Sequence, residues 1–146
     1  CMNMMQLARF ISITARSILC ASMLGALRMS VKFHHQFFSS LSEVMEDVQR
    51  NGTWPTTFVS PPSAGLDPHW HSEEVHAYIM EGETDFLDAG TGVRTTVVAG
   101  DKVIVPARTL HAEGAVKDKV VYILALPEAL DSESFLKMRE PNDLQS

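Results

Sequence analysis

The chain has 146 residues, of which 45% are hydrophobic and 21% are charged, and its formal net charge is -6 at pH 7. This length suits one domain with its own core, and the near-average composition excludes a collagen-like, low-complexity or wholly disordered chain. The acidic excess argues against nucleic acid as a partner, because binding phosphates requires lysine and arginine. No apolar run reaches the roughly 18 residues of a membrane span.

The charges divide the chain into two unlike parts. Residues 1–42 contain four basic and no acidic residues, whereas residues 43–146 contain 18 acidic and 8 basic ones, so the parts carry +4 and -10. The apolar stretch 17–27 has the length of a signal-peptide hydrophobic region. We therefore expect residues 1–28 to be a leader or extension and residues 29–146 to be the folded domain. A cytoplasmic protein is predicted, with a secretory or organellar leader as the alternative.

One helix is predicted near the start of this domain. Ser40 and Glu43 form a capping-box pattern, and apolar residues follow at helical spacing until Asn51-Gly52. The pattern predicts an amphipathic helix between Ser40 and Gly52.

Short runs rich in β-branched and aromatic residues occupy most of the remaining chain. Turn residues separate these runs, which cover 56–60, 75–80, 84–87, 93–98, 102–105 and 120–126. The spacing leaves no room for crossover helices, so the strands are predicted to be antiparallel in a sandwich or barrel. A short C-terminal helix is expected near 132–139, capped by Ser132.

Four of the six histidines lie in this β region: His69, His71, His76 and His111. On an extended segment His-x-His places both rings on one face, because side chains repeat with a period of two. Histidine is also the commonest nitrogen ligand of first-row metals. His69 and His71 could therefore bind one ion together.

The surrounding residues resemble the two motifs of the cupin superfamily. Gly65 precedes His69-Trp70-His71, and Tyr78 to Glu83 closes the first motif; Gly100 to Pro106 leads to His111 in the second. The resemblance implies an all-β fold, an antiparallel β-barrel of the jelly-roll type. It also implies that His69, His71 and His111 bind one divalent transition metal (Fe, Mn, Ni or Zn).

The sequence departs from the motifs at the fourth ligand. The position of the usual glutamate falls on Val75 or His76, and Arg108 replaces the second glycine of the second motif. Glu74 could supply the carboxylate if the preceding turn is one residue tighter, His76 could supply a fourth nitrogen, or no side chain fills the position. We favour Glu74, because strand alternation points His76 away from an interior containing Val75.

Four further residues are candidates for the site. Glu113 shares a face with His111 on an extended segment, so it could act as general base or hold a ligand histidine. Trp70, Arg108 and Tyr122 could contact a substrate. The competing interpretation is that Glu113 and Arg108 are solvated and that Trp70 and Tyr122 only pack in the core.

These features predict a metal-dependent enzyme of dioxygenase, isomerase or lyase type that acts on a small polar organic molecule. The alternative is a non-catalytic, ligand-binding or sensory barrel in which the metal is structural or absent, since this fold has many functions. A homodimer is expected through exposed sheet edges, with residues 31–38 as one possible contributor.

Overall fold

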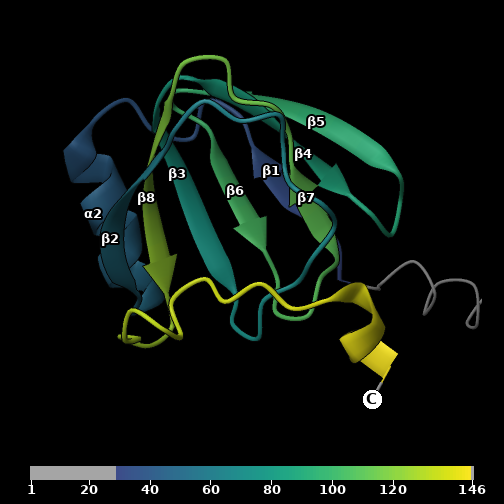
Figure 1. Cartoon of the computed structure of the whole chain (residues 1–146). Helices are drawn as coiled ribbons and strands as arrows, with labels where there is room; N and C mark the ends of the chain where they lie inside the picture. Colours follow the sequence, from purple (N-terminus) through teal and green to yellow (C-terminus); the bar gives the residue numbers. More distant parts are fainter. Residues whose placement is uncertain (1–28, 146) are drawn as a thin grey trace, which may run out of the picture.

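The computed structural model describes residues 29–145, so the leader predicted over residues 1–28 lies outside the described residues. Five antiparallel strands form the larger sheet, in the order β1-β6-β3-β8-β2 (Figure 1). The bounds are β1 Lys32–His34, β2 Trp54–Ser60, β3 Val75–Glu81, β6 Lys102–Val105 and β8 Val120–Leu126. The edge strand β2 pairs along its whole length with β8.

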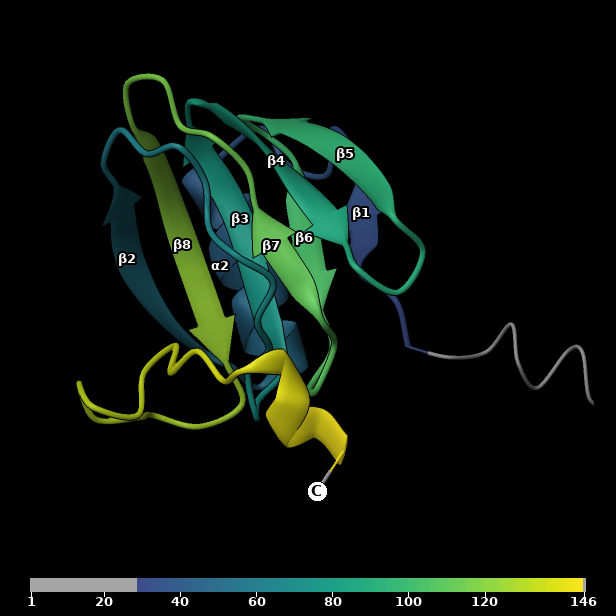
Figure 2. The same cartoon turned by 45° about the vertical axis from the view of Figure 1, so that its right-hand side comes forward.

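A smaller sheet of three antiparallel strands faces the larger one, in the order β5-β4-β7 (Figure 2). Its strands are β4 Glu83–Asp88, β5 Val93–Val98 and β7 His111–Glu113. The main core lies between the sheets and includes Ile79, Phe86, Val97 and Val103. The predicted antiparallel jelly-roll architecture is confirmed, as two facing sheets rather than one closed barrel.

The predicted helix is present as α2, Leu41–Asn51. Ser40 and Glu43 make the reciprocal capping box, and Gly52 ends the helix with a left-handed φ of 63°. The helix packs Val44 and Val48 on the outer face of the larger sheet (Figure 1). No helix among the described residues is long and apolar enough to cross a membrane.

Alternation along β3 separates the two faces of the larger sheet. Val75, Ala77 and Ile79 belong to the core between the sheets, whereas Tyr78 belongs to the cluster under α2. His76, one residue from Val75 and Ala77, therefore points to the helix side. This is the direction that the sequence pattern predicts for His76.

The described residues differ from the sequence prediction in two short strands and in the position of one helix. Strands β1 and β7 have three residues each, too few to show a period, and β1 pairs within the chain with β6. The short C-terminal helix is a 3-10 helix at Pro141–Gln145 instead of near 132–139. Asp131, not Ser132, caps a turn there by accepting the Ser134 amide at 2.8 Å, and Leu136 then adopts a φ of 50°, which no helix tolerates.

Candidate metal site

Backbone hydrogen bonds bring the two sequence motifs together. The amides of His69 and His111 each donate to the other residue's carbonyl, at 2.9 and 3.0 Å, and the Leu66 amide donates to the Glu113 carbonyl at 2.9 Å. Gly65 has a φ of 107°, and a Cβ there would lie 3.3 Å from the Glu113 carbonyl oxygen. The segment containing His69 and His71 thus runs beside β7, and only glycine suits its first position.

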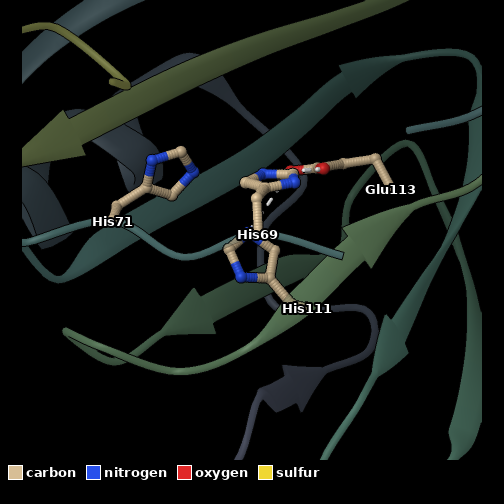
Figure 3. A group of neighbouring side chains, drawn as sticks. All are labelled: His69, His71, His111 and Glu113. Atoms are coloured by element: carbon tan, nitrogen blue, oxygen red, sulfur yellow. Dashed lines mark ion pairs between the residues drawn. The ribbon is translucent and has the colours of Figure 1, made fainter. Parts of the chain in front are cut away.

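Three histidines and one carboxylate converge at the end of this pairing. The potential ligand atoms of His69, His71, His111 and Glu113 all lie within 4.8 Å of one another. The histidines are buried, with exposed fractions of 5, 6 and 1%. Figure 3 shows the Glu113 carboxylate directed toward the His69 ring, 3.4 Å from its Nε2 atom to Oε2. Such a group could hold a metal ion.

Each histidine of the group is oriented by a main-chain carbonyl. The Nδ1 atoms of His69, His71 and His111 lie 2.8, 3.1 and 2.8 Å from the carbonyl oxygens of Asp67, Lys137 and Thr109, in that order. A carbonyl only accepts, so each Nδ1 carries the proton in these hydrogen bonds. In the neutral form of each ring, Nε2 is therefore left with the free lone pair, the arrangement typical of histidines that bind metals.

Glu113 completes the group with an oxygen donor. Its Oε1 atom lies 3.5 Å from His111 Nε2, and its Oε2 atom is buried without a hydrogen-bond partner among the described residues. A buried carboxylate oxygen without a partner is costly, and a cation at this position would satisfy it. The side chains present, three imidazoles and one carboxylate, thus fit a divalent transition metal.

The electrostatics of the site shift His71 toward its neutral form, His111 toward its protonated form and Glu113 toward its ionised form. Burial lowers the pKa of His71 to about 4, so this ring is neutral near pH 7. Burial opposes ionisation of Glu113, but the hydrogen bond and the charge of His111 outweigh it and lower the Glu113 pKa. Conversely, burial acts to lower the His111 pKa, and the Glu113 carboxylate raises it overall. A metal ion would replace the proton that this pair otherwise shares.

The structure does not bring Glu74 or His76 into this group. The Glu74 Oε1 atom lies 2.8 Å from His76 Nε2, and both residues line a separate small pocket with Thr53 and Pro127. That pocket is on the helix side of the larger sheet, where alternation directs His76. The turn after His71 is therefore not tight enough to direct Glu74 inward, and Glu113 provides the carboxylate of the group instead.

Of the three predicted substrate contacts, only Tyr122 lines the cavity beside the histidines. Burial raises the pKa of its hydroxyl, so it stays protonated. Trp70 instead packs under the C-terminal segment, where its indole N–H donates to the Glu140 carbonyl at 2.9 Å. Arg108 stacks 5.0 Å from the Trp70 ring and donates to the Leu144 carbonyl, so its charge is directed away from the cavity.

The contribution of the C-terminal segment to the site is not apparent from the sequence. The Lys137 carbonyl orients His71, and Phe135, Leu136 and Met138 form part of the cavity wall. A main-chain carbonyl leaves no sequence signal, and the apolar residues resemble an ordinary amphipathic turn. Glu113, in contrast, was a candidate from its two-residue spacing to His111, and it lies in the group.

Comparison with known families agrees with this fold and site. Residues 56–127 match the family model described as "Cupin domain". The match includes both motifs and all four residues of the site. This chain therefore contains a cupin domain and belongs to the cupin superfamily. No curated protein matches the chain.

Several solved structures are similar to the chain. A DUF861 family protein from Thermotoga maritima has 19% identity and a TM-score of 0.48, over 66% of this chain and 98% of the other. The DMSP lyase DddQ from Ruegeria pomeroyi has 21% identity and a TM-score of 0.47, over 56% of this chain and 41% of the other. The polyketide cyclase RemF from Streptomyces resistomycificus has 21% identity and a TM-score of 0.45, over 56% and 63%. The aligned region thus spans less than two thirds of the two enzymes.

Proposed function

We propose that residues 29–146 form a single-domain metalloenzyme with one divalent transition metal, of dioxygenase, isomerase or lyase type. The observation that carries this proposal is the convergence of one ring nitrogen from each of the three histidines and a Glu113 carboxylate oxygen within 4.8 Å. His69, His71 and His111 would hold the ion, and Glu113 would take the carboxylate role. A cytoplasmic location stays a prediction of the sequence.

The bound ion would polarise a coordinated carbonyl or hydroxyl group and, if it is iron, would support O2 chemistry. The chain's own residues supply the other requirements. The cavity walls are mostly apolar, and the three carbonyl hydrogen bonds orient the histidine rings. Glu113 has two oxygens, so one can face the ion while the other accepts a proton from a substrate in the cavity.

Metal content tests the proposal most simply. Purified protein reconstituted separately with Fe(II), Mn(II), Ni(II) and Zn(II) should retain about one equivalent of at least one metal, measured by elemental analysis after gel filtration. His111→Ala should lose it, whereas the exposed His34→Ala should bind like the unaltered protein. Equal metal content in all three proteins, or none in any, would contradict the metal site. Bound metal without turnover in an O2-uptake and substrate screen would favour a ligand-binding or sensory role.

We also propose that the protein is a homodimer, as the sequence predicts. The supporting feature is β2, an edge strand that exposes Trp54 and Val59 with fractions of 60 and 52%. An exposed apolar edge commonly pairs with a second copy. Val59→Lys should shift the mass measured by light scattering from dimer to monomer, whereas Thr96→Lys on the exposed face of β5 should not. A monomeric unaltered protein would overturn the proposal.

A further inference from the structure

The cavity beside the histidines has one polar end and otherwise apolar walls. Its volume is about 310 Å³, and His69, His71, His111 and Glu113 lie at one end. Most of the remaining lining is apolar and comes from both sheets and the C-terminal segment, including Phe58, Phe86, Leu124, Phe135, Leu136 and Met138. No lysine or arginine of residues 29–145 lines it. Apart from the metal-site group, only Ser60 and Tyr122 offer polar atoms.

We propose that the ligand of this site is a small molecule with a single metal-binding polar end and an apolar body. This inference rests on the proposed function, because the polar end is assigned to the metal. A polar body would lose its hydrogen bonds to water and find almost none in these walls. The walls therefore select against the small polar molecule that the sequence predicts and favour an aliphatic or aromatic skeleton.

The cavity volume limits the size of this ligand. A water molecule occupies about 30 Å³ in the liquid, so 310 Å³ holds on the order of ten non-hydrogen atoms. A chelating group takes about four of these atoms. An apolar body of about six carbons, the size of a hexyl chain or one benzene ring, would then fill the cavity.

The outer wall of the cavity comes from residues outside the matched cupin domain. Phe135, Leu136 and Met138 lie beyond residue 127, where the cupin match ends. In Figures 1 and 2 this C-terminal segment crosses the lower end of the sheets. It is fixed by backbone hydrogen bonds between Trp70 and Arg139, at 2.9 and 3.2 Å. These three side chains thus contribute to the wall that contacts the apolar body, separate from the metal ligands.

Alkyl hydroxamates of increasing length test the inference, because they share one chelating group. Acetohydroxamate, butyrohydroxamate and hexanohydroxamate are titrated calorimetrically into the full chain, with and without bound metal. We expect the affinity to rise about fourfold per methylene group, on the order of 200-fold from two to six carbons. Gluconohydroxamate, with six carbons but a hydroxylated body, should bind no better than acetohydroxamate.

Variants assign the effect to the C-terminal wall. Met138→Gln introduces a side chain of similar size with a polar end. It should reduce the gain in affinity from acetohydroxamate to hexanohydroxamate several-fold. Glu133→Gln changes an exposed residue of the same segment and should leave the gain unchanged. Met138 is itself 57% exposed, so its replacement should not unfold the protein. Phe135→Leu removes apolar surface at a second position of the wall and should also reduce this gain.

The outcomes separate this inference from the proposed function. If the protein binds metal but its affinity for hydroxamates does not rise with chain length, or is highest for gluconohydroxamate, the proposal of an apolar ligand body is wrong. The metal site would still stand. If the protein binds no metal but its affinity for hydroxamates still rises with chain length, the proposed function is wrong and the apolar ligand body is supported. A rising series that Met138→Gln and Phe135→Leu leave unchanged would overturn the role of the C-terminal wall.

Discussion

The Nδ1 atom of His71 lies 3.1 Å from the carbonyl oxygen of Lys137, a residue 66 positions later in the chain. This hydrogen bond connects the candidate metal site to the C-terminal segment, outside the matched cupin domain. Because the carbonyl accepts the Nδ1 proton, it determines which nitrogen of His71 has the free lone pair. The segment therefore closes the cavity and orients a metal ligand at the same time.

A chain ending at Leu136 should bind metal more weakly than the full chain. It lacks the Lys137 carbonyl, and loss of a partner that orients a ligand typically lowers metal affinity by about 10- to 100-fold. A chain ending at Glu140 keeps that carbonyl and the acceptor of the Trp70 indole, so it serves as the control. Competition with a coloured chelator gives the affinities. Equal affinity for the two shortened chains would argue against this role of Lys137.

Replacing Glu113 should distinguish it from the other candidate carboxylate. Glu113→Gln keeps the size of the side chain but removes its charge, so metal affinity should fall by at least about tenfold. Glu74→Gln is the matched control, since Glu74 contacts His76 in a different pocket. The same chelator competition applies to both variants. If Glu74→Gln lowers the affinity and Glu113→Gln does not, the carboxylate suggested first by the sequence is the ligand.

Replacing Arg108 with glycine should cost less stability than replacing it with alanine. It occupies the position of a motif glycine and has a φ of 61°, a left-handed conformation that is unfavourable for residues with a Cβ. Both replacements lose the contacts with Trp70 and Leu144, but only glycine relieves the backbone. Arg108→Gly should therefore be about 1 kcal/mol more stable than Arg108→Ala in urea denaturation. The reverse order would show that this conformation is not retained in solution.

Asp101 should make the fold sensitive to acid. Burial tends to raise its pKa, but the amides of Val98 and Gln36 and the His35 ring donate to its carboxylate and lower the pKa overall. A lowered pKa contributes stability above the unfolded value of about 3.9, and this stability is lost as the pH falls through the folded value. The free energy of unfolding should therefore decrease below about pH 4.

Asp101→Asn provides the comparison for this acid effect. It should lower the free energy of unfolding by about 1–3 kcal/mol at pH 7, because Asn cannot accept all three hydrogen bonds as a carboxylate does. It should also make the free energy of unfolding depend less on pH below about pH 4. Glu46→Gln changes an exposed residue of α2 and should leave the pH dependence of the free energy of unfolding as in the unaltered protein. Urea denaturation at several pH values measures both. An unchanged slope in Asp101→Asn would refute the assignment.

Much of the fold follows from local sequence patterns. The helix was predictable because the capping box and Gly52 act within a few residues, and β5, β6 and β8 have the predicted bounds since turn residues delimit them. Strand β7 was missed, and β1 was expected only as an edge strand for a second copy, because pairing with distant strands, not a local pattern, makes both extended. The C-terminal helix was misplaced because the Asp131 side chain forms a turn that competes with it.

The candidate site was predictable only in part for a similar reason. His69, His71 and His111 stand in a recognisable motif, and the structure brings them together. The carboxylate was harder to identify, because the turn after His71 decides whether Glu74 faces inward, and a turn of one residue more or less reverses that direction. The apolar cavity was not foreseen, since its walls come from several strands and a distant segment.

A crystal structure of the metal-reconstituted protein, with anomalous data collected at the metal's absorption edge, would locate the ion and so test the metal site itself. We expect one anomalous peak per chain, at bonding distance from the Nε2 atoms of His69, His71 and His111 and from a Glu113 oxygen. A peak beside Glu74 and His76, or no peak at the three histidines in protein shown to contain metal, would contradict it.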